Sequence, residues 1–337
     1  MRVQERDAKT RGFGLAAVLV AFVSLGILST VTAAQSEQND GKNAAEHAAA
    51  SRSSAPQAGQ KTFSSPAEAC KTLVEAVKND DQSMLLGVLG ANAKEIISSG
   101  DDAEDKQNRD QFVQKYQQMH RLVNEPDGTT TLYIGAENWP TPIPLVHQGR
   151  EWYFDTAAGK QEILYRRIGK NEMAAIQVCN ELVDAQKEYQ AQTHDGDSER
   201  QYAQKFTSDP GKQNGLYWES SENSKSPIGP LVAVAATESA RQGPDQNQQP
   251  FQGYYFRILK RQGAKAQGGT KKYVVDGKMT VGFAFIAYPA EFRSSGVMTF
   301  VVNQDGIVYE KDLGPKTAEM AKSMKQYNPD GSWRKAD

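Results

Sequence analysis

Histidines are the first residues to weigh for catalysis or metal binding, because imidazole acts both as a general base and as a metal ligand near neutral pH. The chain contains His47, His120, His147 and His194, and none has metal-ligand spacing to another histidine or to a cysteine. His120 is predicted on a helix surface and His147 on a strand, which is more typical of structural residues than of a catalytic pair. The alternative is that one of them acts as a base in a pocket.

Two further patterns resemble ligand-binding motifs without completing them. The run Gly-Ala-Lys-Ala-Gln-Gly-Gly-Thr at residues 263–270 approaches a phosphate loop, but Gly269 stands where the essential lysine would be. The acidic runs at residues 101–105 and 195–199 lack the ligand order of a calcium loop. We therefore expect a hairpin loop at the first place and solvated acids at the others, with no cofactor and no metal.

Cys70 and Cys179 are the only cysteines, and both fall on apolar faces of predicted helices. In an oxidising compartment a disulfide between them would join two domains. With about 110 residues enclosed, the chain-entropy model gives such a bridge roughly 4 to 5 kcal/mol. Each position equally suits a small buried thiol. The sequence leaves the bridge and the pair of free thiols as alternatives.

The N-terminus predicts where the protein is sent. Four Arg and Lys residues in the first eleven positions precede an apolar run at residues 12–31, which exits through small residues including Ala33 and Ala34. This order is typical of an export signal with cleavage after Ala33 or Ala34. About 20 apolar residues also suffice to span a bilayer, so an uncleaved anchor is the alternative. We expect a periplasmic or secreted protein, associated with the membrane only if the signal is uncleaved.

Composition and charge indicate the broad organisation. The formal net charge of −2 gives no electrostatic case for a nucleic-acid partner. Residues 35–61 follow the signal at residues 1–34 and contain hardly any bulky apolar side chain, which predicts a disordered linker. The rest is long enough for two domains, expected at residues 62–159 and 160–337. The partner we expect is another envelope protein.

The first domain is predicted to place helices before strands. Ser65 and Glu68 form a capping box that starts a helix, and Asp81 caps a second one. A third helix is expected from residue 105 to residue 124. Strand patterns follow at residues 130–134, 143–147 and 151–154.

Aromatic residues are concentrated in the strand part of this domain. Trp139 begins a segment with alternating prolines, which predicts a sheet edge or a stiff loop. With Trp152 and Phe154 available to fill a concave sheet, the order of elements resembles the cone-shaped α+β fold of the nuclear-transport-factor-2 type. Such cones enclose a pocket or serve as inert adaptor modules. Trp139, Trp152, Phe154, His120 and His147 are therefore the candidate residues of a pocket or partner surface.

The second domain begins with the longest helical pattern of the chain, at residues 161–193, followed by a turn-rich section. Four strand candidates come next, at residues 254–260, 280–288, 297–302 and 307–312, with Asp305-Gly306 as a hairpin connection. A long helix followed by a meander resembles the head of a type IV pilin or pseudopilin, down to Asn171-Glu172 and Ala287-Tyr288-Pro289. The resemblance implies the shape of the head only, because the apolar stem of a pilin would be a whole domain away.

Five motifs together carry a more specific resemblance. They are Phe-Ser-Ser-Pro at 63–66, Trp-Pro-Thr-Pro-Ile-Pro-Leu at 139–145, Trp-Tyr-Phe-Asp-Thr at 152–156, Arg-Arg-Ile-Gly-Lys-Asn-Glu at 166–172 and Tyr-Pro-Ala-Glu-Phe at 288–292. From Thr62 onward the chain resembles a bacterial exported family known as domain of unknown function 2950. The resemblance implies no assigned activity, so it provides no catalytic residue.

The sequence thus predicts an α+β protein of two tandem domains, each with helices followed by an antiparallel sheet, after a disordered N-terminal tether. We expect a non-catalytic envelope protein with a binding or assembly role. One alternative is a small-molecule-binding or hydrolytic enzyme with a pocket in the first domain, walled by Trp152, Phe154, Tyr116 and Tyr133. Another is an accessory component of a pilus or secretion machine.

Overall fold

The computed structural model describes residues 55–98, 102–219, 225–235 and 249–336. The predicted signal at residues 1–34, and the linker up to residue 54, lie outside the described residues. The described residues divide into two compact units, unit 1 up to residue 165 and unit 2 from residue 166. The division falls within one long helix, a few residues after the predicted domain boundary.

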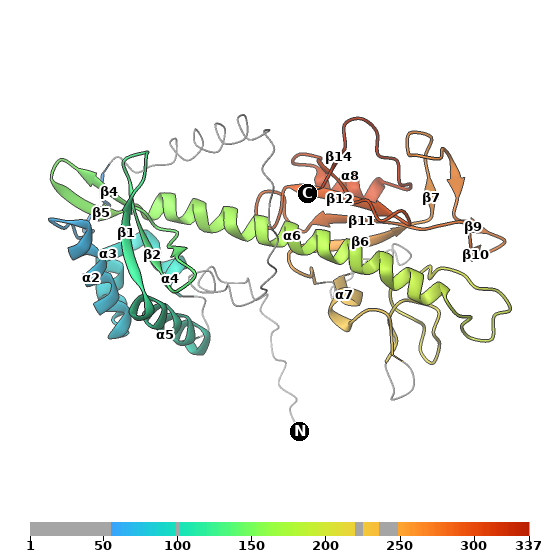
Figure 1. Cartoon of the computed structure of the whole chain (residues 1–337), viewed down its shortest axis with the longest axis horizontal. Helices are drawn as coiled ribbons and strands as arrows, with labels where there is room; N and C mark the ends of the chain where they lie inside the picture. Colours follow the sequence, from blue (N-terminus) through green and yellow to red (C-terminus); the bar gives the residue numbers. More distant parts are fainter. Residues whose placement is uncertain (1–54, 99–101, 220–224, 236–248, 337) are drawn as a thin grey trace, which may run out of the picture. The chain divides into compact units, whose positions relative to one another are not determined.

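Unit 1 begins with a group of helices (Figure 1). Its helical elements are α2 (Pro66–Lys78), α3 (Gln82–Leu89), the 3-10 turn η2 (Ala91–Ala93), α4 (Lys94–Ile97) and α5 (Asp102–Gln118). The predicted helix start at Ser65 is confirmed, since Glu68 N donates to Ser65 Oγ, 3.2 Å; the Glu68 carboxylate accepts from Ser64 N, 3.0 Å, one residue before the N-cap. Asp81 caps α3 by accepting from Met84 N, 2.9 Å.

A five-stranded antiparallel sheet completes unit 1. Its strands are β1 (His120–Asn124), β2 (Thr130–Ile134), β3 (Trp139–Pro140), β4 (Leu145–Gln148) and β5 (Glu151–Phe154), in the order β1-β2-β4-β5 with β3 also paired to β2. The proline-containing segment thus forms a short edge strand, as predicted from its missing donors. Alternate residues of β2 (Thr130, Leu132 and Ile134) are buried, so one sheet face forms part of the core.

The prediction that the third helix continues to residue 124, with His120 on its surface, was wrong. Helix α5 ends at Gln118, and His120 starts β1, where it pairs with Ile134 of β2. The hairpin turn explains the difference: Gly128 adopts φ +84, and Asp127 accepts from Thr129 N, 3.0 Å. This turn chemistry sets the register, and strand pairing outweighs the helical spacing of the apolar residues.

Residues just before the predicted start of the first domain also pack on unit 1. The Gln60 side chain is buried and donates to Val88 O, 3.2 Å, and to Phe154 O, 2.8 Å. Lys61 N donates to Gly87 O, 2.8 Å. The last residues of the predicted linker therefore belong to the folded unit, through polar contacts that an apolar pattern does not reveal.

Helix α6 (Thr156–Gln190) starts in unit 1 and runs into unit 2. The central sheet of unit 2 has the order β14-β13-β12-β11-β6. Its strands are β6 (Tyr254–Leu259), β11 (Ala284–Pro289), β12 (Met298–Asn303), β13 (Tyr309–Asp312) and β14 (Arg334–Lys335). The remaining elements are α7 (Pro230–Ala235), α8 (Thr317–Ser323) and the short strands β7 (Arg261–Gln262), β8 (Lys271–Lys272), β9 (Val274–Val275) and β10 (Lys278–Met279).

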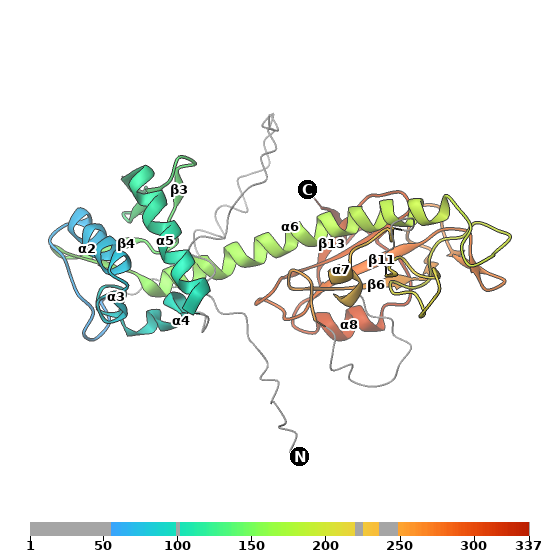
Figure 2. The same ribbon diagram turned by 90° about the horizontal axis from the view of Figure 1, so that it is seen from below.

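The central sheet of unit 2 is covered on both faces. Every residue of β11 is buried, which requires packing on each side. Figure 2 shows α6 along one side of the sheet and α8 on the other. Side chains of β6 point alternately to these two layers. Arg257 donates to Ala321 O and Met324 O at the end of α8. Tyr254 lies on the α6 side: burial is the main cause that raises its pKa, and Glu172 and Cys179 of α6 raise it further.

The predicted strands and hairpins of the second domain are confirmed with shifts of a few residues. The β12–β13 pair is antiparallel, and Gly306 in its turn has φ +77. The glycine-rich run joins β7 to β8, which pair antiparallel, so it is a hairpin loop. With helices and antiparallel sheets in both units, the protein is α+β. Among the described residues, no helix is long and apolar enough to cross a membrane.

Helix α6 holds the loop between β11 and β12 through two side chains of the 166–172 motif. Glu172 Oε1 accepts from Val297 N, 2.8 Å, and from Met298 N, 3.0 Å. Asn171 Nδ2 donates to Ser295 O, 2.8 Å. These contacts explain the Asn-Glu pair of the motif as a structural clamp on the chain just after the 288–292 motif.

Replacing Glu172 tests this clamp. Glu172→Ala leaves two half-buried amides without their acceptor and should lower the free energy of unfolding by about 2 kcal/mol. Glu172→Gln keeps an acceptor oxygen and should cost about 1 kcal/mol. Denaturant unfolding measures both, with the exposed Glu188→Ala on the same helix as the matched control. Equal effects of Glu172→Ala and Glu188→Ala would contradict the assignment.

Alkaline pH tests the burial of the core tyrosines. Burial raises the pKa of Tyr189 to about 12, and it also raises the pKa of Tyr254, Tyr273 and Tyr327 above 10.0. In the unfolded chain these phenols ionise near pH 10. The contribution of the buried neutral phenols to the free energy of unfolding is therefore complete below that pH and is lost as the pH rises toward 12. We expect a lower unfolding free energy at about pH 11 than at about pH 8.

The pH dependence has a matched control. Tyr189→Phe should reduce the difference in unfolding free energy between the two pH values, whereas Tyr165→Phe, at a side chain that is 46% exposed, should not. Ionisation of every tyrosine near pH 10 in the folded protein, followed by absorbance, would show that these phenols are not buried.

Candidate functional sites

Unit 1 contains an apolar pocket of about 50 Å³. Its walls come from α2 (Leu73 and Val77), α3 (Leu85 and Leu89), α4 (Ile96 and Ile97), α5 (Phe112), the 141–143 segment and Phe154 of β5. Small-molecule sites span about 300–1,000 Å³, so this volume suits one apolar group rather than a whole ligand of ordinary size.

The proline-containing segment forms one wall of this pocket because it is held from both sides. Thr141 N donates to Leu132 O, 2.8 Å, and Asp155 N donates to Pro144 O, 2.9 Å. Behind it, α6 approaches closely: a Cβ at Gly159 would lie 2.6 Å from Ile143 Cγ1. Only glycine permits this approach without a shift. The 139–145 and 152–156 motifs meet at the pocket, since Thr141, Pro142, Ile143 and Phe154 all line it.

Two ionisable side chains from α5 also border the pocket. Asp105 is only 3% exposed, and Arg109 Nε lies 2.8 Å from Asp80 Oδ1. Arg109 Nη1 is buried and has no hydrogen-bond partner among the described residues. The spacing of four residues places both side chains on the same face of α5. The pocket is therefore apolar with a charged border.

The predicted site residues are not gathered at this pocket. Phe154 lines it, whereas Trp139 and Trp152 are half-buried and pack against the core. His147 lies 4.9 Å from the Trp152 ring. His120 is exposed, stacks on Tyr116 at 3.8 Å and has its Nδ1 2.9 Å from Tyr116 O. Among the described residues, no carboxylate hydrogen-bonds either imidazole.

Sequence reasoning missed Asp105 and Arg109. Both lie in a strongly charged helix whose pattern indicates a solvated surface, and only the packing of α5 on the other elements buries them. The one available signal was their four-residue spacing, which places an acid and a base on one helix face but says nothing of burial.

Unit 2 contains a larger and more polar cleft of about 280 Å³. The β7–β8 loop, the β12–β13 turn and the segment after α8 form its walls, including Lys265, Asp305, Tyr309, Tyr327 and Asp330. The glycine-rich run of residues 263–270 is therefore at a cleft, although its sequence is incomplete as a phosphate loop. Charges of both signs and two phenol rings give this cleft a chemistry different from that of the pocket in unit 1.

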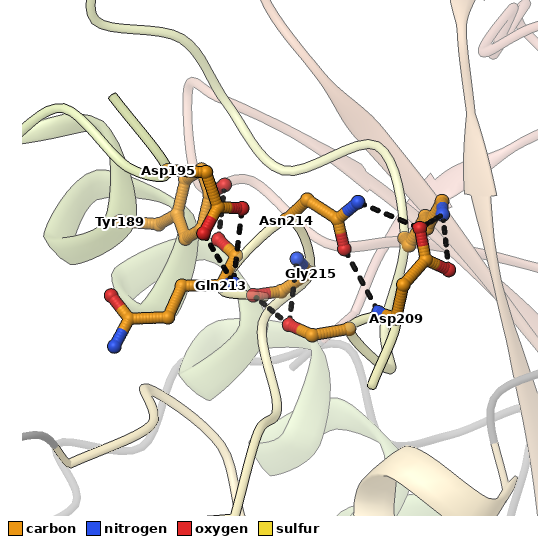
Figure 3. Close-up of polar contacts among 8 residues, drawn as sticks. Tyr189, Asp195, Asp209, Gln213, Asn214 and Gly215 are labelled. Carbon is orange, nitrogen blue, oxygen red and sulfur yellow. Dashed lines mark hydrogen bonds and ion pairs between the residues drawn. The ribbon is translucent and has the colours of Figure 1, made fainter. Parts of the chain in front are cut away.

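Asp195, in the acidic run at residues 195–199, and the nearby Asp209 both stabilise turns of the chain after α6 (Figure 3). Both Asp195 oxygens accept from Gln213 N, at 2.9 and 3.0 Å, while Tyr189 Oη donates to Gln213 O, 2.8 Å. Asp209 Oδ2 accepts from Asn214 Nδ2, 2.8 Å. No group of His, Cys, Asp and Glu within the described ranges is arranged to hold a metal ion. These carboxylates hold the loop after α6.

Comparison with known proteins identifies a family. The model of the family described as "Protein of unknown function (DUF2950)" matches residues 60–336. Since the match covers most of the chain, the chain belongs to this family, as its motifs predicted. No curated protein and no solved structure matches it. The resemblances to a nuclear-transport-factor-2 cone and to a pilin head therefore stay predictions.

A count of thiols tests the state of the two cysteines. Cys70 lies in the core of unit 1 and Cys179 in the core of unit 2, and both are free in the structure. Burial raises the pKa of each thiol to about 12, so native protein should react slowly with thiol reagents. Denatured, unreduced protein should give two thiols per chain. A count of none would show that the cysteines are bridged.

Proposed function

We propose that this member of the DUF2950 family is an exported envelope protein that binds a partner and is not an enzyme. Export is supported by the basic start, the apolar run at residues 12–31 and the small residues at Ala33 and Ala34. Binding is supported by the apolar pocket of unit 1, which is the observation that carries the proposal. The partner is a protein of the same compartment.

The size and walls of the pocket favour a protein side chain as its occupant. A volume of about 50 Å³ accepts one apolar group, and apolar anchors that fill such pockets provide much of the affinity of protein interfaces. Leu73 and Val77 on α2 are half-buried wall residues, so a partner gains by covering them.

The charged border favours specificity over affinity. Arg109 is already ion-paired with Asp80, and Asp105 is almost fully buried. Polar groups at the border of an apolar pocket orient a partner. They also disfavour a partner that offers them no hydrogen bond, because they would lose their water on binding and gain nothing in return. A partner with an apolar anchor and neighbouring hydrogen-bond acceptors suits Arg109.

In-cell crosslinking tests the proposal. A photo-reactive benzophenone residue at Val77 should capture one defined envelope protein, because the pocket wall lies in the interface. The matched control is the same residue at Val281, which is 48% exposed and lies in unit 2. Leu73→Asp should abolish capture from position 77 by placing a carboxylate at the pocket, while Lys71→Asp on the exposed side of α2 should not.

Two outcomes would reject the proposal. One is capture from position 77 that persists in the Leu73→Asp variant, provided that this variant unfolds at the same denaturant concentration as its parent. The other is turnover of a cell-wall or lipid substrate by the purified protein that is lost when a pocket residue is changed. The second outcome would instead favour the enzyme.

A further inference from the structure

The polar cleft of unit 2 is built from stretches of chain that are far apart in the sequence. The β7–β8 loop contributes Lys265, the β12–β13 turn contributes Asn303 and Asp305, and the segment after α8 contributes Tyr327 and Asp330. Its volume of about 280 Å³ is near the lower end of the 300–1,000 Å³ range of small-molecule sites. One ring-sized ligand fits such a space.

A buried polar network fixes the glycine-rich loop beside the cleft. Tyr273 and Gln262 are fully buried, and Tyr273 Oη donates to Gln262 Oε1, 2.8 Å. Gln262 Nε2 donates to Gln267 O and to Gly269 O, both 2.8 Å. Asn303, a cleft residue that is 2% exposed, interacts with the Tyr273 side chain and opposes the rise of its pKa that burial causes. The loop is thus held in place by the Gln262 side chain of β7, which Tyr273 in turn holds.

The same loop is tied to the C-terminal segment. Gly263 N donates to Tyr327 O, 2.9 Å, and Lys265 N donates to Asn328 Oδ1, 2.8 Å. A Cβ at Gly263 would lie 2.4 Å from Asn328, so glycine is needed for this close contact. The walls are therefore fixed before any ligand arrives, which lowers the entropic cost of binding.

Three polar atoms around the cleft keep unused hydrogen-bonding capacity. Asp305 Oδ2 accepts from Asn303 Nδ2, 2.9 Å, and Asp330 Oδ1 accepts from Ser332. The other oxygens, Asp305 Oδ1 and Asp330 Oδ2, accept from no described residue, and Lys265 Nζ donates to none. A carboxylate offers about four lone-pair sites and an ammonium three donors, so the cleft presents both acceptors and donors to a ligand.

The charges decide which ligand chemistry suits the cleft. Two carboxylates and the ammonium of Lys265 line the cleft, and Lys311 also acts on Asp330, so the cleft has no excess of positive charge to hold an anion such as phosphate, although the neighbouring loop resembles a phosphate loop in sequence. Hydroxyl groups both donate and accept, which matches Asp305, Asp330 and Lys265 together. Tyr309, which is half-buried, offers a phenol ring to the C–H face of a sugar ring, while Tyr327, at 4% exposure, is part of the cleft wall.

We propose that this cleft binds a neutral sugar ring, as a monosaccharide or as the end of a glycan. The two carboxylates accept from its hydroxyl groups, Lys265 donates to a ring or hydroxyl oxygen, and Tyr309 packs on its apolar face. This inference goes beyond the proposed function, because it concerns another site in the other unit and does not depend on the apolar pocket.

Titration of the purified full chain with sugars tests the inference. Glucose, galactose, mannose and N-acetylglucosamine are followed by saturation-transfer NMR and calorimetry, each as the free sugar and as a disaccharide ending in it. At least one should bind saturably with a Kd of about 1 mM or tighter. Equal affinity of the free and linked forms identifies a monosaccharide site, and tighter binding of the linked form identifies a glycan end.

Isosteric variants locate the binding. Asp305→Asn and Asp330→Asn keep their turns and should each weaken binding by about tenfold, since a charge-assisted hydrogen bond is lost. Lys265→Met, an exposed change, should weaken it as well. The matched control is Asp276→Asn at the exposed β9–β10 turn, where φ is +49 and Asn is tolerated. Its affinity should equal that of the parent.

The inference is overturned by any of three results. The first is that none of the four sugars binds saturably in either form. The second is that a sugar binds, but with an affinity that all three cleft variants leave unchanged. The third is that inorganic phosphate or calcium displaces the bound sugar by occupying the same residues. Because Lys265 has no hydrogen bond from its ammonium to the described chain, Lys265→Met stays informative even if a turn variant fails to fold.

Discussion

Unit 2 depends on the burial of β11 on both faces. A strand whose six residues are all buried needs a layer on each side, and the apolar stripe of α6 and the short α8 supply them. Burying α8 against a sheet has a polar consequence, because its last carbonyls must be satisfied. Arg257 does this by donating to Ala321 O and Met324 O, and burial lowers its pKa. These two hydrogen bonds cap the end of α8.

Much of this architecture could be predicted where local chemistry decides the structure. The helix start at Ser65, the Asp81 cap and the Asp305-Gly306 hairpin each need only a few neighbouring residues, and all three are present. His120 shows the limit. Its segment has helical spacing, but pairing with β2 is a longer-range interaction, and a sequence window does not contain it.

The candidate sites were harder to predict for a similar reason. Phe154 could be anticipated because it is an aromatic residue of a predicted strand, expected to fill the concave sheet, and it is buried. Asp105 and Arg109 are surface residues by composition and become pocket residues only through packing. The cleft of unit 2 joins a loop, a turn and a C-terminal segment whose contacts are mainly hydrogen bonds to backbone atoms, and such contacts leave no pattern in the sequence.

The two sites suit different kinds of recognition. The pocket of unit 1 gains free energy from covering apolar surface, whereas the cleft of unit 2 exchanges hydrogen bonds with water for hydrogen bonds with a ligand. The partner proposed for unit 1 is an envelope protein, so export is the central claim. The most direct measurement is the N-terminal sequence and cell fraction of the natural product. The account predicts an envelope or secreted protein beginning at Ala34 or Gln35, and an intact chain beginning at Met1 in the soluble cell interior would contradict it.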